Sequence, residues 1–390
     1  MSLNLDRSTW KRVKLGDVVL RSRTQIDPVE GGVDRYVAGG HVDTENVIIH
    51  RFGDVADGQM GSTFRYLFKP GQVLFVSARP YLRKAGVPDF TGVVADKTYV
   101  LGAAPGNGLL HDILPFLLTS DRFVEYATQE ATGSMNPRLL WGAMQRYEFD
   151  LPPLDEQRRM ADLLWAVERE RDAVRILLGE VDATTSVWLN EVFDRDSVTE
   201  RPMGEMLDIC QYGLSARAGE TGAYPMLRMT NLGNGGVTDL NLKYCDLSES
   251  DFKSYRVHDG DVLFNRTNSV ELVGRSGIFR LDGDFVFASY LVRLRSRPDE
   301  LMPDYMNEFI NSLIGQRRIR VHLSKGVSQA NISASKLRTV KIPVPPIDRQ
   351  REFVMRLDAL RKRRSTVADR LTSVSNLAQR LQIEIFGGAA

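Results

Sequence analysis

Two stretches of the chain place an apolar residue at alternating steps of three and four positions, which is the heptad pattern of a coiled-coil helix. The stretches 155–193 and 348–386 contain no proline, and each follows a Pro-Pro pair with an aspartate placed to cap a helix. We therefore predict two long helices that pack along a common seam. The first supplies Met160, Leu164, Val167, Arg171, Val174, Leu178, Val181 and Trp188 to the seam. The second supplies Phe353, Leu357, Leu360, Arg364, Val367, Leu371, Val374 and Leu381.

A charged residue breaks each seam once, at the same place in the pattern: Arg171 and Arg364. A lone polar seam residue commonly sets the register of a coiled coil at a cost in stability. An arginine that extends to solvent along the apolar surface explains the same residue equally well. Both interpretations remain open from the sequence.

The rest of the chain alternates short β-rich runs with Gly, Asp and Pro turns, and a helical stretch follows late in each half. We therefore expect an α+β fold. The expected strands are 36–38, 47–49, 73–76 and 98–101, then 262–264, 276–279 and 290–294, and the expected helices are 111–130 and 303–320.

The two halves of the chain also match each other. A shift of 193 residues lays 151–158 on 344–351 and 191–193 on 384–386, while 71–75 matches 260–264 at a shift of 189. Matches in constant order indicate an internal repeat. We predict globular domains at 1–150 and 199–342, with helical segments at 151–198 and 343–390.

The repeat and the charges predict how the helices pair. Each 39-residue helix is about 58 Å long, too far for a compact half of about 15 Å radius of gyration to carry the chain back. We therefore expect antiparallel helices related by a pseudo-twofold axis. The first has nine acidic and five basic residues and the second five and nine, so they should attract each other. Alternatively, the basic run 361–364 contacts DNA.

Composition narrows the classes of function. The 390 residues are 43% hydrophobic and 26% charged, as in a soluble globular protein. No apolar run reaches the ~18 residues of a membrane span and the start lacks a signal-peptide core, so we expect a cytoplasmic protein with no membrane partner. Cys210 and Cys245 and the scattered histidines suggest neither a disulfide framework nor a metal site. Lys plus Arg is 51 against 50 for Asp plus Glu, so only local placement can indicate nucleic acid.

Polar loops follow the central strand of each half. Residues 79–84 read Arg-Pro-Tyr-Leu-Arg-Lys, and residues 265–269 read Asn-Arg-Thr-Asn-Ser. Arginine forks onto guanine, asparagine pairs with adenine, and lysine neutralises phosphate. Equivalent loops with different residues would read different base sequences. A loop whose polar groups only bind its own backbone remains the alternative.

These residues resemble those of the specificity (S) subunit of type I restriction-modification enzymes. The turns 151–157 and 344–350 are similar to the family's PLPPLxEQ motif, with Arg349 in place of Glu in the second. Residues 79–84 resemble its RPYLNK loop, with Arg83 in place of Asn, and 260–274 resemble its GDVLFNRTNSxELVG segment. Residues 326–332 resemble its loop before the last strand, whereas their counterpart 133–137 departs from it.

The resemblance implies two target-recognition domains, each reading one half of a bipartite, non-palindromic site in double-stranded DNA. The helices would set the spacer and dock two modification subunits, and restriction subunits would join them. S-adenosylmethionine and ATP are expected on those partners, with no cofactor in this chain. The candidate DNA contacts are Arg79, Tyr81, Arg83, Lys84, Arg228, Asn231, Asn265, Arg266, Asn268, Arg275, Ser328 and Gln329.

No catalytic motif accompanies these features. The sequence has no GxxxxGK[ST] phosphate loop and no Asn-Pro-Pro-aromatic tetrad of amino-methyltransferases, so we expect a non-catalytic subunit. Two other classes remain open. One is a fragment of a single-chain restriction-modification enzyme, and the other is a coiled-coil scaffold with two adaptor heads that bind no DNA, which the near-zero net charge favours.

Overall fold

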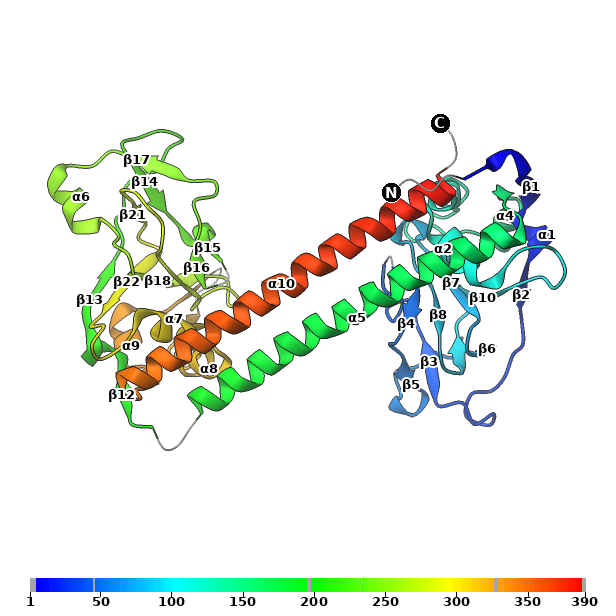
Figure 1. Ribbon diagram of the computed structural model, residues 1–390. Coiled ribbons are helices and arrows are strands. Elements are labelled where there is room, and N and C mark those ends of the chain that lie inside the picture. Colours follow the sequence, from blue (N-terminus) through cyan, green and yellow to red (C-terminus); the bar gives the residue numbers. More distant parts are fainter. Residues whose placement is uncertain (1–4, 45, 195–197, 234, 326–328, 388–390) are drawn as a thin grey trace. The chain divides into compact units, whose positions relative to one another are not determined.

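The computed structural model describes residues 5–44, 46–194, 198–233, 235–325 and 329–387. It divides into a first unit, residues 1–178 with 367–390, and a second unit, residues 179–366. Two helices of 40 residues, α5 (Leu154–Phe193) and α10 (Ile347–Phe386), contribute to both units (Figure 1). Each unit therefore combines parts of both helices with one globular head, which we call the first head (residues 5–151) and the second head (residues 198–343).

The first head is built on two sheets. The larger has the order β2-β10-β7-β8-β4, and the smaller β5-β3-β9-β6. The larger comprises β2 (Val19–Ser22), β10 (Thr98–Ala103), β7 (Val73–Val76), β8 (Ala85–Pro88) and β4 (Ile48–Ile49). The smaller comprises β5 (Gly53–Asp54), β3 (Arg35–Val37), β9 (Gly92–Val94) and β6 (Tyr66–Phe68). The remaining elements are the paired strands β1 (Lys11–Lys14) and β11 (Glu148–Leu151), and the helices α1 (Leu15–Val18), α2 (Leu114–Thr119), α3 (Asp121–Gln129) and α4 (Trp141–Gln145).

The second head also has one large and one small sheet, of orders β13-β22-β18-β20-β16-β15 and β17-β14-β21. The large sheet comprises β13 (Leu207–Tyr212), β22 (Leu291–Ser296), β18 (Val262–Asn265), β20 (Ser276–Ile278), β16 (Gly236–Val237) and β15 (Leu232–Gly233). The small one comprises β17 (Lys243–Cys245), β14 (Tyr224–Leu227) and β21 (Val286–Phe287). The short strands β19 (Thr267–Asn268), β24 (Ala330–Asn331) and β23 (Ser324–Lys325) form a further sheet, and β12 (Glu200–Pro202) pairs with β25 (Lys341–Pro343). Its helices are α6 (Glu249–Tyr255), α7 (Pro303–Asn311), α8 (Leu313–Arg320) and α9 (Ala334–Arg338).

The strand orders of the two heads correspond. In chain order, β2, β7, β8 and β10 occupy the places that β13, β18, β20 and β22 occupy in the second head. The parallel pairs correspond as well, because β3 pairs with β9 as β14 pairs with β21, and β4 pairs with β8 as β16 pairs with β20. The two central strands, β7 and β18, are buried along their whole length.

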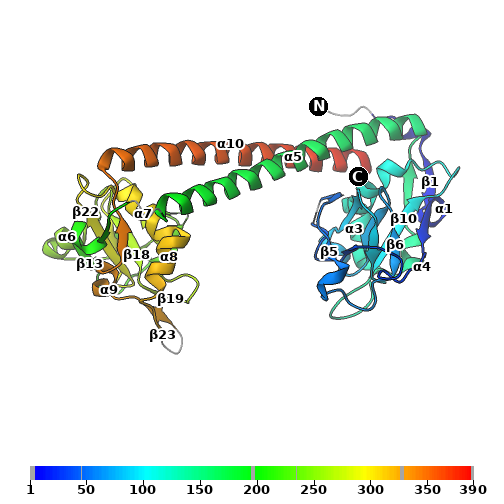
Figure 2. The same cartoon turned by 90° about the horizontal axis from the view of Figure 1, so that it is seen from below.

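The expected helices 111–130 and 303–320 are each divided in two, which the sequence pattern did not indicate. Ser120 and Ser312 have extended backbone angles and cap the second helix of each pair. Each serine hydroxyl accepts a hydrogen bond from the backbone three residues on, at 3.4 and 3.0 Å. A serine satisfies otherwise unpaired N–H groups in this way, so it begins a new helix rather than continuing the old one. Figure 2 shows the resulting pair α7 and α8 beside the helix ends of the second unit.

A buried glutamine joins each long helix to its head. Gln157 is 0% exposed, accepts from the backbone N–H of Leu110 at 2.7 Å and donates to two carbonyl groups. Gln350 is also 0% exposed and makes the same three kinds of contact, accepting from Met302 at 2.8 Å. These glutamines end the two matched Pro-Pro motifs, so those motifs are helix-to-head anchors.

The helices begin two residues earlier than they would if the aspartates were the N-caps. Because α5 starts at Leu154 and α10 at Ile347, Asp155 and Asp348 lie in the first turn. A carboxylate there is stabilised by the positive end of the helix dipole. Both aspartates also pair with the arginine three residues on, at 3.1 and 2.8 Å.

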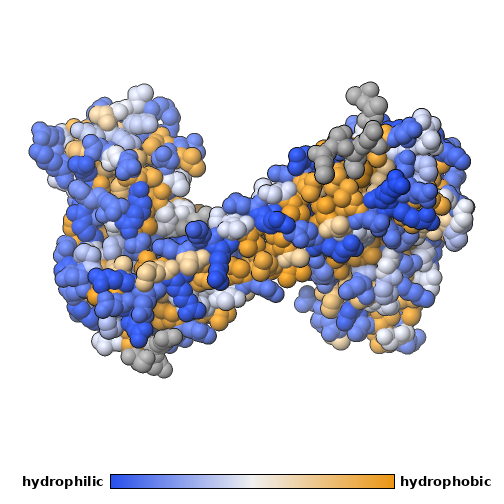
Figure 3. All heavy atoms as spheres, in the orientation of Figure 1, coloured by the Kyte–Doolittle hydropathy of each residue, from blue (hydrophilic) through white to orange (hydrophobic). Residues whose placement is uncertain are grey.

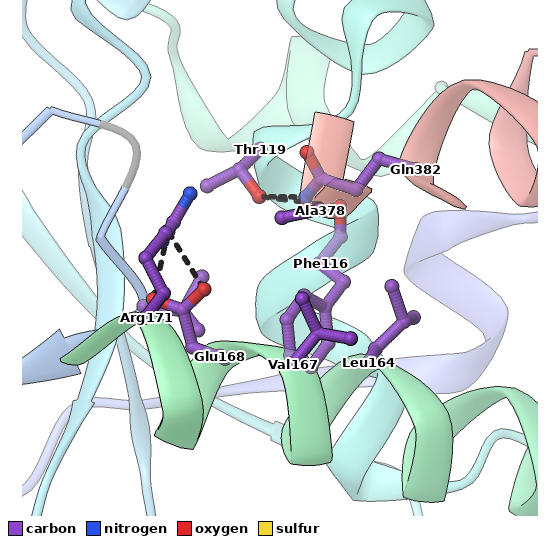
Figure 4. A pocket seen from close by; sticks show the side chains of 9 residues that line it. Phe116, Thr119, Leu164, Val167, Glu168, Arg171, Ala378 and Gln382 are labelled. Atoms are coloured by element: carbon purple, nitrogen blue, oxygen red, sulfur yellow. Dashed lines mark hydrogen bonds and ion pairs between the residues drawn. The ribbon is translucent and has the colours of Figure 1, made fainter. Parts of the chain in front are cut away.

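Within each unit, contacts run in opposite order along the two helices. In the first unit, Leu164 and Val167 line a small cleft with Ala378 and Gln382, and further along α5 Glu170 pairs with Arg370 at 2.6 Å (Figure 4). In the second unit, Asp182 pairs with Arg364 at 2.6 Å, and Trp188 stacks on Phe353 with ring centroids 5.0 Å apart. The helix segments in each unit are therefore antiparallel.

Burial follows the expected seam, with one exception. Most seam positions are buried or half-buried, but Arg171 is 11% and Arg364 53% exposed in the side chain. The buried ones are Met160, Leu164, Val167, Val174, Phe353, Leu357, Val374 and Leu381. The half-buried ones are Leu178, Val181, Trp188, Leu360, Val367 and Leu371. Among the described residues, no helix has the length and apolarity that a bilayer span requires.

Candidate nucleic-acid interface

Arg266 lies directly after the central strand β18 of the second head and is held on several sides. Its guanidinium carbon lies 4.7 Å from the centroid of the Tyr212 ring. Its Nη2 donates to Oδ1 of Asn331 at 3.2 Å, and its Nη1 donates to the carbonyl of Ser289 at 3.4 Å. Stacking and hydrogen bonding fix the plane of a guanidinium, so Arg266 is positioned before any ligand binds.

Tyr212 and Asn331 are the residues of this site that the sequence-based list of contacts omits. The Tyr212 hydroxyl accepts from the backbone N–H of Ala334 at 2.8 Å, and Nδ2 of Asn331 donates to Oγ1 of Thr267 at 2.8 Å. Both side chains thus have fixed orientations toward Arg266. Asn331 falls in a motif that the resemblance includes, but no sequence signal identifies Tyr212, because it comes from the edge strand β13.

Two asparagines of the expected contact set are buried and support their own loops. Asn231 is 0% exposed; its amide donates to the carbonyls of Thr238 and Leu240, and its Oδ1 accepts from the backbone of Arg228. Asn265 is 3% exposed and donates to the carbonyl of Leu272 at 3.3 Å. Neither amide faces solvent, so we leave both out of the surface proposed to contact DNA. Here the alternative of a loop that binds its own backbone describes the geometry.

The other candidates of the second head lie nearer the surface. Asn268 is half-buried, with its Oδ1 accepting from the backbone of Ser269 at 2.8 Å. Arg228 is half-buried and donates to the carbonyl of Asn241 at 2.7 Å, whereas Arg275 and Gln329 are exposed. Ser328 lies outside the described residues. Besides Arg266, the candidates of the second head that solvent can reach are therefore Asn268, Arg228, Arg275 and Gln329.

The loop 79–84 of the first head divides into exposed and tethered side chains. Arg79 is exposed and Tyr81 is 50% exposed. Arg83 pairs with Asp121 at 2.6 Å, and Nζ of Lys84 donates to the carbonyl of Gly39 at 2.7 Å. Arg79 and Tyr81 are thus presented to solvent, while Arg83 and Lys84 hold the loop on the head.

Backbone geometry adds to the case for this loop. Arg79 and Arg83 both have φ of 53°, in the left-handed region that side chains with a Cβ disfavour. Such strain is commonly found at functional sites. The backbone N–H of Arg79 also donates to the carbonyl of Pro137 at 2.7 Å, which fixes the start of the loop against the segment 132–138.

No metal chemistry is evident in the part of the chain that the structure describes. Among those residues, no group of three or more His, Cys, Asp or Glu side chains could hold a metal ion. The candidate loops 79–84 and 265–269 instead carry guanidinium, amide and aromatic groups, which can bind nucleic acid by hydrogen bonding and stacking.

A family model matches part of the chain. The type I restriction modification DNA specificity domain matches residues 197–374, which include the second head and most of α10. The matched residues make up less than half of the chain. This part of the chain is similar to the specificity domain of type I restriction-modification enzymes.

Curated specificity subunits match parts of the chain. The EcoKI specificity subunit of Escherichia coli K12 is 26% identical over 263 residues, which are 61% of this chain and 56% of that subunit. The putative MjaX specificity subunit of Methanocaldococcus jannaschii is 25% identical over 156 residues, which are 39% of this chain and 37% of that subunit. The matches thus cover about half or less of the length of these specificity subunits.

Solved structures of the specificity family share the fold. The S subunit of the type I system from M. genitalium has a TM-score of 0.59 at 12% identity, with 100% of both chains covered. A chain from a study of complex assembly and conformational transition of a type I system has a TM-score of 0.58 at 22% identity, with 97% of this chain and 98% of that chain covered. The α+β fold with a long helix is therefore shared with these two solved structures.

Proposed function

We propose that the chain is the non-catalytic DNA-reading subunit of a type I restriction-modification assembly, with each head reading one half of a bipartite, non-palindromic target. One observation carries the proposal. Two heads with corresponding strand orders present different polar side chains after the same central strand, Arg266 and Asn268 in one and Arg79 in the other. Corresponding scaffolds with different contact residues are what two half-sites of unlike sequence require.

We further propose that the chain is an internal duplication with a pseudo-twofold axis. Its target-recognition domains would be 1–150 and 199–342, with the spacer helices 151–198 and 343–390 paired antiparallel. The opposite order of helix contacts within each unit supports this arrangement. The two buried glutamine anchors, Gln157 and Gln350, support the duplication, because they stand 193 residues apart and make the same contacts.

The helices would set the unread spacer and dock two modification subunits, with restriction subunits joining later. A helix of 40 residues is about 60 Å long, which exceeds the ~34–36 Å between half-sites one turn apart. Apolar side chains gather along the visible face of the helices (Figure 3). In the first unit, Ile176, Leu177, Leu377 and Ile383 are 41–49% exposed. Such side chains are suited to a protein partner.

Partner subunits would also bind the cofactors of the assembly. S-adenosylmethionine and ATP would bind to the modification and restriction subunits, and the assembly would act in the cytoplasm on double-stranded DNA. The formal net charge of +1 gives little long-range attraction to phosphate. We therefore expect the isolated chain to bind DNA far more weakly than its complex with modification subunits.

Methylation mapping tests the proposal. The chain, assembled with its modification subunits, is incubated with a random-sequence DNA library, and methylated sites are sequenced. We expect a split motif with two short specified halves and a fixed unread gap. Methylation or binding without sequence preference would contradict DNA reading and favour the coiled-coil scaffold.

A second version of this experiment tests the role of the helices. Inserting one heptad into both α5 and α10 adds about 10 Å to each helix. The gap of the methylated motif should change while both specified halves stay the same. An unchanged gap would show that another element sets the spacer.

A further inference from the structure

Two arginines of the first head meet at one buried tyrosine ring. Tyr99, on β10, is 1% exposed, and its hydroxyl donates to the carbonyl of Leu139 at 2.8 Å. The guanidinium carbon of Arg21, on β2, lies 4.0 Å from the ring centroid, and that of Arg138 lies 5.8 Å from it. An aromatic face attracts a guanidinium and orients it. The ring therefore holds two positive charges at a fixed place.

Arg21 has no acidic partner there. Within the described ranges of the chain, its guanidinium makes no hydrogen bond and no ion pair, and its Nε is buried without a hydrogen-bond partner. Burial lowers the pKa of Arg21, and the positive charges of Arg23 and Arg138 lower it further. A partly desolvated guanidinium beside two others gains from any acceptor that reaches it. Arg21 thus has unused donor capacity at the surface of the head.

Arg138 has protein partners, but they use only one carboxylate. Its Nε donates to Oγ of Ser77 at 3.0 Å, its Nη1 lies 3.0 Å from Oδ2 of Asp96, and its Nη2 donates to the backbone carbonyl of Asp96. Among the described residues, Asp96 is the one carboxylate that forms an ion pair with Arg21, Arg138 or the exposed Arg23, and it pairs with Arg138. The cluster keeps an excess of positive charge, although the whole chain has almost none.

The cluster stands where the second head places Arg266. The backbone of Arg138 bridges to Ala78 as Asn331 pairs with Thr267, so Ser77 corresponds to Arg266 and Arg138 to Asn331. In the second head, the guanidinium belongs to Arg266, which follows the central strand, and its partner Asn331 comes from a later segment. In the first head the two roles are exchanged: Arg138 of the later segment supplies the guanidinium, and Ser77 after the central strand supplies the hydroxyl. Both heads thus hold an oriented arginine where these two segments meet.

We propose that Arg21, held on Tyr99 beside Arg138, binds acceptor atoms of DNA in the half-site that the first head reads. This inference rests on the proposed function and adds residues that the motif comparison does not supply. The acceptors are the O6 and N7 of guanine or the oxygens of a phosphate, both of which match a guanidinium fork. Arg79 starts beside Pro137, which extends the same surface into the loop 79–84.

The test compares Arg21→Gln with Arg12→Gln in the complete complex with modification subunits. Arg12 is the matched control, because it belongs to the same head and loses the same charge, but pairs with Glu148 and Asp150. Binding to the mapped target and to single-base variants is measured at several salt concentrations, together with thermal stability. We expect Arg21→Gln to weaken specific binding about tenfold or more and Arg12→Gln to leave it within about twofold.

The pattern of loss identifies the acceptor. A loss confined to one base position of one half-site would indicate a guanine edge. A uniform loss with a salt slope about one unit smaller would indicate a phosphate. Unchanged binding by Arg21→Gln, with or without lower stability, would overturn the inference. If the unaltered complex shows no sequence preference, the proposed function itself fails, which is a separate outcome.

Discussion

Arg171 and Arg364 stand 193 residues apart at the same place in the two long helices, yet they differ in burial and in their ion-pair partners. Arg171 is nearly buried and pairs within α5 with Glu168, whose side chain is 3% exposed, at 2.7 Å (Figure 4). Arg364 is half-exposed and pairs with Asp182 of the other helix. The same break in an apolar seam is thus a buried ion pair in the first unit and a surface ion pair in the second.

The neighbouring head explains the difference. In the first unit, the apolar Phe116 of α2 lines the cleft beside Glu168 and Arg171, so these two charges have each other as partners. In the second unit, α7 carries Glu308, which is buried and pairs with Arg361 of α10. Burial raises the pKa of Glu308, although Arg361 opposes that effect. The residues of the neighbouring head therefore influence whether a helix arginine pairs within its own helix, as Arg171 does, or with the head, as Arg361 does.

The largest effect that we predict comes from breaking the buried pair. Arg171→Met leaves the Glu168 carboxylate buried and without this partner, which typically costs about 3–5 kcal/mol. The free energy of local unfolding of the first unit should fall by about this amount, while the second unit keeps its stability. Hydrogen exchange resolved by segment measures the two units separately.

The double variant Glu168→Met/Arg171→Met separates charge from packing. Because it removes both buried charges, it should recover most of the loss that Arg171→Met causes. A double variant as unstable as the single one would show that the guanidinium contributes by packing and not by neutralising Glu168.

The two glutamine anchors should contribute about equally to the stability of their units, unlike the two seam arginines. Gln157→Ala and Gln350→Ala each remove three hydrogen bonds and leave buried backbone groups without partners. We expect roughly 3 kcal/mol of destabilisation in each case, confined to the unit that contains the anchor. Gln129→Ala, on the exposed face of α3, is the control. Clearly unequal losses in hydrogen exchange would show that the two motifs are not equivalent.

These residues also show how far the sequence alone leads. The heptads predicted both helices and nearly all of the buried seam, because burial on a helix follows its period. The sequence could not distinguish Arg171 from Arg364, since their different burial depends on the head packed beside each helix, such as Phe116 beside Arg171, which is remote in the chain. It also could not place the breaks at Ser120 and Ser312, because a serine inside an apolar helical pattern is equally compatible with a continuous helix.

The two surfaces that we propose to contact DNA can be distinguished by a substitution that keeps the charge. Arg266→Lys retains one positive charge but loses the planar fork and the stacking on Tyr212. We expect about 1–3 kcal/mol of lost discrimination at one base position of one half-site. Methylation mapping should then show one relaxed position and an unchanged other half.

The choice of Arg266 for this test shows what the structure adds to the motifs. The motif gave Asn265, Arg266 and Asn268 equal weight as contacts. Burial separates them, because Asn265 on β18 faces the interior of the head, whereas Arg266 is held by Tyr212 and Asn331. Relaxation of both half-sites by Arg266→Lys would contradict the assignment of one half-site to each head.

The smallest predicted effect concerns the surface pair of Arg364 and Asp182. Both side chains are about half-exposed, at 53% and 46%, so solvent screens their attraction and the side chains lose freedom when they pair. A double-mutant cycle of Arg364→Ala and Asp182→Ala should give a coupling of only about 0.2–1 kcal/mol, and 1 M salt should reduce it further. The same cycle on Arg171 and Glu168 should give several times that coupling, since those charges are buried. Equal couplings would mean that burial does not distinguish the two arginines, and the contrast between the units would then lie in their heads alone.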